Sequence, residues 1–392
     1  MNSLPGNRRT DRRPQRVVMA FGTRPEAIKM APVYRALQSF PGIEPVVLLT
    51  GQHEEQLRQA LDFFGIPAAH NLSVMTERQE LTDLAARILP HAARSFRALE
   101  ADYVLVHGDT LTTFVCAWAA FLERLPVGHV EAGLRSANLA EPFPEEANRR
   151  LTGVIADVHL APTAAARHNL LREGVDPDRI VVTGQTGIDA ILEAARLGTY
   201  PGELPPSPYV VITLHRRENW PHLRALCQAL AYLARAHPHV TFIYPIHMNP
   251  IVRERVYPVL DGICNVWLIE PLEYGAMAVL LRESTLIVTD SGGLQEEGAA
   301  LGVPVVVVRN VTERPEGVDS GILRLAGTDP QRLIEVVGEL LASESERRRM
   351  QAAVNPYGDG QAAVRVAQAV AWRLGLAERP DDWSPTTVQS LG

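Results

Sequence analysis

Short apolar runs alternate with longer amphipathic segments along this chain. In the first half, the apolar runs fall at 16–21, 45–50, 103–107, 127–130, 158–161 and 180–183. Between them, apolar residues recur at helical spacing over 25–39, 54–64, 110–124, 145–155 and 164–173. Several of the runs are apolar at successive positions, as in strands that are buried on both faces. Strands that alternate with helices in this way predict an α/β fold with a parallel, doubly wound sheet.

The alternation breaks once and then starts again. Residues 198–208 contain two glycines and four prolines, which is typical of a linker or a domain boundary. Further apolar runs follow at 209–213, 241–245, 266–269, 286–289 and 303–308. We therefore predict two Rossmann-like domains, over 16–186 and 187–360, followed by an amphipathic helix at 361–376. Residues 1–15 are expected to be a disordered leader, and residues 377–392 a frayed tail.

Composition and charge narrow the functional classes. A net charge of -7 without a basic stripe argues against a nucleic-acid partner. The three cysteines are far apart in sequence, which argues against a zinc site or a disulfide framework and fits a reducing compartment. No apolar run reaches the roughly 18 residues of a membrane span. We expect a cytoplasmic protein without a metal centre or a membrane anchor.

Lys29 is the only lysine among 38 basic residues. Coding bias with one chance survivor is one interpretation, and a need for a compact ammonium that guanidinium does not replace is the other. The surroundings favour the second, because Gly22, Arg24 and Pro25 follow the first apolar run and open a helix. A helix N-terminus with nearby cations is a natural anion site.

Three carboxylates follow strands or begin helices in the first domain. Asp109 comes after the run 103–107, where capping of the next helix is an alternative role. Glu131 directly continues the run 127–130, so neither capping nor solvation explains it, although Arg135 is a possible ion-pair partner. Glu145 begins a helix, where the helix dipole alone favours a carboxylate. Carboxylates that converge raise one another's pKa, which suits acid–base catalysis.

The second domain carries basic and glycine-rich motifs after its strands. His215, Arg216 and Arg217 follow the run 209–214, where they are suited to binding phosphate. Gly292 and Gly293 open a helix after the run 286–289, so backbone N–H groups can approach a phosphate closely. Three further residues could contact the same ligand: Ser291, Glu297 and Arg314.

Taken in chain order, these motifs resemble the non-hydrolysing bacterial UDP-N-acetylglucosamine 2-epimerases over about residues 16–375. The motifs are Gly22–Glu26, His107–Thr110, His129–Arg135, Pro144–Glu146, His215–Glu218, Asp290–Glu297, Thr312–Pro315 and Asn355–Gly360. The resemblance implies the GT-B architecture, in which two Rossmann-like domains face each other across a cleft. It also implies that the final helix packs back on the first domain.

The resemblance further implies a reaction without a cofactor, in which UDP is eliminated to leave 2-acetamidoglucal and then adds back with inversion at carbon 2. The product supplies N-acetylmannosamine-type sugars for cell-surface polysaccharide. By motif, the catalytic residues are Asp109, Glu131, Glu145 and His215. By motif, the substrate is bound by Arg24, Lys29, Asp109, Glu131, His215, Leu272, Met277, Ser291, Gly292, Gly293, Glu297 and Arg314.

Family members also bind a second UDP-N-acetylglucosamine as an activator and form homodimers. The positions that match the activator site are Gln52, Glu55, Arg78, Glu145, Arg216 and His247. We predict that this activator site is present. Glu55 stands where some members have glutamine, and a carboxylate there could weaken or alter activation.

Three other functions stay open at this stage. An epimerase for a UDP-diacetamido uronic acid would share the same motifs. A glycosyltransferase would need an acceptor site but not three carboxylates. A non-catalytic UDP-sugar sensor would be expected to lack the carboxylates, and all three are present.

Overall fold

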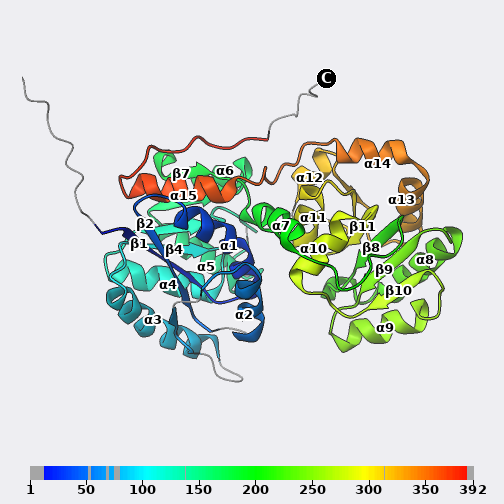
Figure 1. The fold of residues 1–392 in the computed structure, drawn as a ribbon, viewed down its shortest axis with the longest axis horizontal. Coiled ribbons are helices and arrows are strands. Elements are labelled where there is room, and N and C mark those ends of the chain that lie inside the picture. The colour runs from blue at the N-terminus through cyan, green and yellow to red at the C-terminus, as the bar shows by residue number, and fades with distance from the viewer. Residues whose placement is uncertain are drawn as a thin grey trace, which may run out of the picture. The chain divides into compact units, whose positions relative to one another are not determined.

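Two parallel sheets with helices packed against them form the fold (Figure 1). The computed structural model describes residues 13–51, 54–67, 70–74, 80–136, 138–312 and 314–385. They divide into two compact units. Unit 1 holds the described residues up to Ala161, with Ala165–Val181 and Ala363–Asp382, and unit 2 holds Pro162–Ala164, Val182–Ala362 and the described residues from Trp383.

Unit 1 is built around a seven-stranded sheet in the order β3-β2-β1-β4-β5-β6-β7. Its strands are β1 (Gln15–Phe21), β2 (Ile43–Leu49), β3 (His70–Asn71), β4 (Tyr103–His107), β5 (Val127–Val130), β6 (Val158–Ala161) and β7 (Ile180–Val182). Its helices are α1 (Arg24–Gln38), α2 (Glu54–Phe63), α3 (Leu81–Ala98), α4 (Leu111–Leu122), α5 (Glu145–Ile155), α6 (Ala164–Arg172) and α15 (Ala362–Arg373).

Unit 2 is built around a six-stranded sheet in the order β10-β9-β8-β11-β12-β13. Its strands are β8 (Tyr209–Thr213), β9 (Thr241–Pro245), β10 (Val266–Ile269), β11 (Leu286–Thr289), β12 (Val305–Val307) and β13 (Leu323–Leu325). Its helices are α7 (Thr186–Leu197), α8 (Leu223–Ala236), α9 (Pro250–Leu260), α10 (Tyr274–Arg282), α11 (Gly292–Ala300), α12 (Pro315–Asp319), α13 (Pro330–Ala342) and α14 (Glu344–Gln351).

The predicted parallel α/β sheets are confirmed, and the reason lies in strands buried on both faces. In β8, Val210 and Ile212 belong to one apolar cluster, whereas Tyr209 and Val211 belong to another. Because successive side chains point to opposite faces of a sheet, such a strand is apolar throughout.

Each sheet has one point where the strand order reverses. In unit 1, β1 pairs in parallel with both β2 and β4. In unit 2, β8 pairs in parallel with both β9 and β11. The loops after β1 and β4, and those after β8 and β11, therefore diverge at the carboxyl edge of their sheet. Ligands of open parallel sheets bind at such a switch point.

Several expectations about the chain ends and the break were wrong. The leader was predicted to reach residue 15, but Arg13 pairs with Asp102 at 2.7 Å and β1 begins at Gln15. The tail is not frayed at its start, because the Trp383 N–H donates to the Val182 carbonyl at 2.8 Å. The proline-rich segment 198–208 lies inside unit 2, within the range 187–360 predicted for the second domain, so it is not a linker between the units.

Helix α3 was not predicted, although a signal for it exists. Its buried residues are Leu84, Ile88, Ala92 and Phe96, which are spaced four apart as on one helix face. The final helix α15, shown in red in Figure 1, packs in unit 1, where Arg373 pairs with Asp157. None of the described helices is long and apolar enough to span a membrane.

Candidate active site

The loop after β1 is held by a buried carboxylate, that of Glu26. Glu26 is 3% exposed and accepts the backbone N–H groups of Gly22 and Thr23 at 3.1 and 2.8 Å. Its other oxygen accepts the Thr110 hydroxyl at 2.8 Å and the Thr113 hydroxyl at 3.2 Å. Glu26 thus joins the loop after β1 to the loop after β4 at the switch point. Arg24 begins α1 beside this network.

Glu131 lies directly after β5 in a strained backbone conformation. Its φ is +64°, a region that non-glycine residues seldom adopt and that is often found at functional sites. Its side chain is 10% exposed and pairs with Lys29 from α1. The lone lysine and the carboxylate that capping does not explain are therefore direct partners. Arg135, the partner suggested by sequence, instead makes an ion pair with Glu173 at 2.7 Å, so that expectation was wrong.

Asp109 lies after β4, close to Glu131 and paired with Arg149 of α5. Its role as a helix cap is not observed, because Thr110 caps α4 by accepting the Thr113 N–H at 3.1 Å. Burial raises the pKa of Asp109, and the charge of Glu131 acts in the same direction, whereas Arg149 opposes both. A buried carboxyl group with a raised pKa is a candidate for proton transfer.

Helix α5 brings its first turn to the same edge. The Asn148 amide donates to the Asp109 carbonyl at 3.0 Å, and Arg149 lies one residue further along the helix. Glu145 begins α5, four residues before Arg149, so the two residues share a helix face. The three predicted carboxylates therefore belong to elements that meet around Asp109.

A neutral histidine lies behind Glu131. The side chain of His107 is 4% exposed, and its Nε2 lies 3.7 Å from a carboxylate oxygen of Glu131. Burial lowers the pKa of His107 to about 4, so the ring is uncharged at neutral pH. His107 belongs to a sequence motif, but the motif alone predicts no role for it.

In unit 2, two guanidinium groups lie over the start of α11. Ser291 is the N-cap residue of this helix. A β-carbon at Gly292 would lie 2.9 Å from Nη1 of Arg314 and 3.4 Å from Nη2 of Arg216. Arg314 is held by Glu296 of the same helix at 2.6 Å. Free N–H groups at a helix start and two cations beside them form an anion site, and glycine is needed there for space.

His215 and His247 lie beside each other at the carboxyl edge of the second sheet. Their rings are stacked, with centroids 5.1 Å apart and an interplanar angle of 12°. The loop that carries His215 also holds Arg216 and Arg217, so the three predicted basic residues after β8 are at this edge.

The remaining predicted binding residues of unit 2 differ in exposure and partners. Glu297 accepts the Tyr274 hydroxyl at 3.2 Å, so part of its hydrogen-bonding capacity is used within the unit. Gly293 is exposed, with nothing within 4 Å of a β-carbon placed on it. Leu272 and Met277 are half-buried and pack against an apolar cluster of unit 2.

Two of the predicted activator residues, Gln52 and Arg78, lie outside the described residues. Glu55 belongs to α2, but its side chain is not among those described. Arg216 and His247 lie together with His215 in unit 2, and Glu145 is in unit 1.

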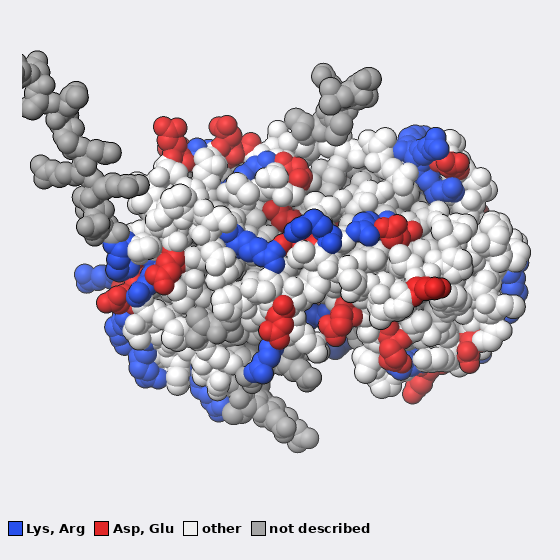
Figure 2. Space-filling view, viewed as in Figure 1, with Lys and Arg blue, Asp and Glu red and all other residues white. Residues whose placement is uncertain are grey.

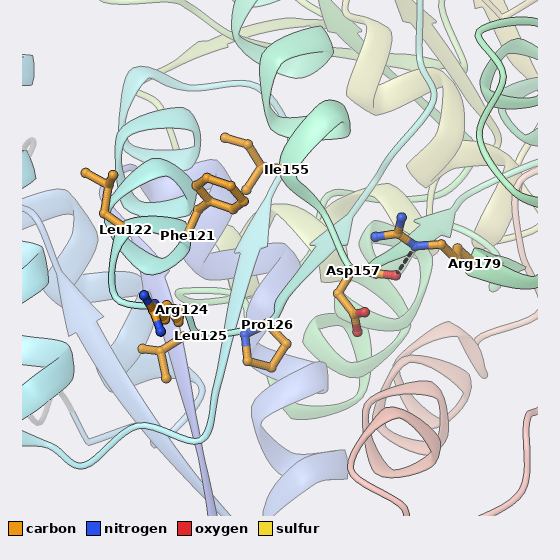
Figure 3. Close-up of a pocket in the computed structure, with 8 residues that line it drawn as sticks. All are labelled: Phe121, Leu122, Arg124, Leu125, Pro126, Ile155, Asp157 and Arg179. Atoms are coloured by element: carbon orange, nitrogen blue, oxygen red, sulfur yellow. Dashed lines mark hydrogen bonds between the residues drawn. The ribbon is translucent and has the colours of Figure 1, made fainter.

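A separate pocket of unit 1 lies at the opposite edge of its sheet. Its volume is about 600 Å³, and it is lined by Phe121, Leu122, Arg124, Leu125, Pro126, Ile155, Asp157 and Arg179 (Figure 3). Pro126 and Asp157 directly precede β5 and β6, so this pocket is at the amino ends of the strands and not beside Asp109 and Glu131.

On the face shown in Figure 2, basic and acidic side chains are interspersed.

Comparison with known proteins gives consistent matches over nearly the whole chain. A family model described as UDP-N-acetylglucosamine 2-epimerase matches residues 35–371. A UDP-N-acetylglucosamine 2-epimerase of Escherichia coli K12 is 46% identical over 368 residues, covering 91% of this chain and 98% of the relative. A Bacillus subtilis protein of the same name is 43% identical, covering 94% of this chain and 98% of its own.

Solved structures agree with these matches. A crystal structure of a putative UDP-N-acetylglucosamine 2-epimerase from Listeria monocytogenes has a TM-score of 0.88 and 40% identity, and covers 94% of this chain and 99% of that chain. A Neisseria meningitidis UDP-GlcNAc 2-epimerase bound to UDP-GlcNAc has a TM-score of 0.81 and 40% identity, with coverage of 92% and 99%. The GT-B fold class predicted from the sequence is confirmed by these structures.

Proposed function

This chain belongs to the UDP-N-acetylglucosamine 2-epimerase family, and we propose that it interconverts UDP-N-acetylglucosamine and UDP-N-acetylmannosamine by eliminating UDP and adding it back. The observation that carries the mechanism is the grouping of Asp109 and Glu131 at one switch point, each paired with a cation. A pair of carboxyl groups of this kind can accept and return a proton, which epimerisation at carbon 2 requires.

The elimination step breaks two bonds of the sugar. A base takes the proton from carbon 2, the electron pair of that bond forms the carbon 1–carbon 2 double bond, and the diphosphate oxygen leaves carbon 1 with its bonding electrons. In the reverse step, the diphosphate oxygen bonds to carbon 1 and a proton reaches carbon 2 from the opposite face. These steps need two acid–base groups, which we propose are drawn from Asp109, Glu131 and Glu145.

The leaving diphosphate must be stabilised while negative charge develops on it. We propose that the N–H groups at the start of α11, with Ser291, Arg314 and His215, bind UDP. In unit 1, Arg24 and Lys29 are the cations that the sequence motifs assign to the substrate, and Lys29 pairs with Glu131.

Deuterium exchange tests the proposed reaction most directly. The protein is incubated with UDP-N-acetylglucosamine in heavy water, and the sugars are followed by NMR. We expect UDP-N-acetylmannosamine with deuterium at carbon 2, and traces of the glycal. Product without deuterium would contradict elimination and re-addition, and binding without product would favour the sensor.

Sugar specificity is tested by offering a UDP-diacetamido uronic acid under the same conditions. We expect slower turnover than with UDP-N-acetylglucosamine. Faster turnover would assign the chain to the related sugar. UDP release that depends on an added acceptor alcohol would instead indicate a glycosyltransferase.

We also propose a second UDP-N-acetylglucosamine as an activator, a homodimeric assembly and a cytoplasmic location. Support for the activator is the exposed His247 stacked on His215, with the half-buried Arg216 next to His215 in the chain. Addition of UDP-N-acetylglucosamine should then stimulate the reverse reaction, whereas hyperbolic kinetics without stimulation would argue against it. Light scattering of the purified protein tests the dimer.

A further inference from the structure

The loop that carries His215 is held by one fully buried carboxylate, that of Asp290. Asp290 follows β11 and has 0% exposure. It accepts the backbone N–H of His215 at 3.0 and 3.1 Å, and that of Arg216 at 2.9 Å. It also accepts the side-chain amide of Asn219 at 3.1 Å. All four contacts come from three donors in the segment after β8, so Asp290 fixes this loop across the switch point of unit 2.

The same carboxylate faces the ring of His215. The distance between Nδ1 of His215 and Oδ1 of Asp290 is 3.7 Å, which is too long for a hydrogen bond but short for two charges. One face of the His215 ring is covered by the ring of His247, which is stacked on it. The His215 side chain remains 34% exposed. The nitrogen nearer the carboxylate is therefore Nδ1, and Nε2 is the nitrogen further from it.

The other charges near the ring disfavour its protonation. Burial lowers the pKa of His215, and His247 and Arg216 act in the same direction. Asp290 is the group that opposes them among the described residues that act on this ring. Asp290 accepts N–H groups on both carboxylate oxygens, and Oδ1 is also the oxygen that lies nearest Nδ1 of His215. The carboxylate therefore holds the loop and places its negative charge beside the ring.

We propose that Asp290 is a positioning residue that directs Nδ1 of His215 inward, stabilises its protonated ring and leaves Nε2 to act on the diphosphate. Asp290 itself touches no substrate. The proposal rests on the proposed function, because it assumes that His215 acts on UDP. It assigns the first residue of the Asp290–Gly293 motif a role separate from that of the phosphate-binding glycines.

The test compares Asp290→Asn with a matched control, Thr213→Val. The control removes the buried hydroxyl contact between Thr213 and Thr289, which is 2.7 Å long and lies beside Asp290, without removing the carboxylate. The His215 pKa is followed by NMR of ring-labelled protein, with His215→Gln used to assign the signal. We expect Asp290→Asn to lower this pKa by about one unit, and Thr213→Val to leave it unchanged.

Kinetics give the second readout. The limb of the kcat pH profile that follows His215 should move to lower pH in Asp290→Asn by the same amount, with a smaller change in KM. A lower Tm with an unchanged His215 pKa and an unchanged profile would overturn the proposal and leave Asp290 with a structural role only.

A readout on the unaltered protein covers the case in which Asp290→Asn does not fold. The ring nitrogen shifts of neutral His215 should then show the proton on Nδ1, facing the carboxylate. A proton on Nε2 would overturn the proposal. The NMR results need no turnover, so they stand apart from the deuterium-exchange test of the reaction itself.

Discussion

The carboxyl edges of the two sheets carry ion pairs in opposite arrangements. In unit 1, Asp109 pairs with Arg149, and the carboxylate is the more exposed partner, at 28% against 13%. In unit 2, Arg314 pairs with Glu296, and the guanidinium is the more exposed partner, at 21% against 10%. The more buried partner in each case fixes the more exposed one. The first edge thus presents carboxylates for proton transfer, and the second presents cations for an anion.

Glu131 offers the largest expected effect and tests the first edge. Replacing it with glutamine keeps its size but removes the charge, so proton transfer at carbon 2 should fail. We expect kcat to fall by about 10³-fold, while the Kd for UDP changes by less than about threefold. Deuterium exchange and calorimetry measure the two quantities.

The control for Glu131→Gln is Glu44→Gln, which removes an exposed carboxylate of the same unit that pairs with Arg16 at 3.0 Å. This variant should keep full turnover. A loss of UDP affinity in Glu131→Gln as large as the loss of kcat would mean that Glu131 is structural, and the comparison between the edges would break.

Arg314 tests the second edge. Replacing it with glutamine removes a charge-assisted contact with the diphosphate, so the Kd for UDP should rise about 30-fold, or roughly 2 kcal/mol. The variant also leaves Glu296 without this partner and should lower Tm. The double variant Arg314→Gln with Glu296→Gln should recover Tm but not UDP affinity. Recovery of both would show that Arg314 only stabilises α11.

Lys29 is an exception to this comparison. It lies on the edge that presents carboxylates, yet its side chain is more exposed than that of its partner Glu131, at 26% against 10%. Lys29→Arg keeps the charge but replaces a compact ammonium by a planar fork. We expect kcat to fall about tenfold, since the larger group displaces Glu131. Steady-state kinetics of Lys29→Arg and Lys29→Met are compared. The first variant changes the shape of the cation, and the second removes its charge. Wild-type turnover in Lys29→Arg would mean that the lone lysine reflects coding bias.

Much of the fold could be predicted, because buried parallel strands are apolar at every position. The bounds of β4, β5 and β11 follow directly from the sequence. Helix α3 has a clear apolar face, but Pro90 lies in its interior, where proline disfavours a helix, so the two signals in the sequence disagree.

The candidate site was predicted only in part, for a physical reason. Residues directly after strands, such as Asp109 and Glu131, are brought to the edge by the sheet itself. Their partners come from helices whose packing the sequence pattern does not specify. Arg149 reaches Asp109 because α5 packs against α4 and β5, and Arg135 pairs with Glu173 instead of Glu131. The four-residue spacing between Glu145 and Arg149 places both on one face of α5, and this was the signal in the sequence that Arg149 lies near the carboxylates.

Buried histidines provide a comparison of the two units in acid. Each histidine is expected to change the free energy of unfolding by less than the variants above change activity or binding. Burial lowers the pKa of His107 and His129 to about 4 and that of His159 to about 3, and all three lie in unit 1. The unfolded chain binds protons below about pH 6.5, whereas the folded unit does not, so stability is present above that pH and is lost as the pH falls below it.

Each of these histidines should cost about 1 kcal/mol between pH 7 and pH 5.5. His159→Gln should remove that share of the pH dependence, and the exposed His168→Gln should not. Urea unfolding at both pH values measures it. Equal pH dependence in the two variants would mean that the His159 ring is protonated in the folded unit. Because unit 1 holds all three rings, its hydrogen-exchange protection factors should fall at pH 5.5 before those of unit 2, so acid would disturb the proton-transfer edge before the anion-binding edge.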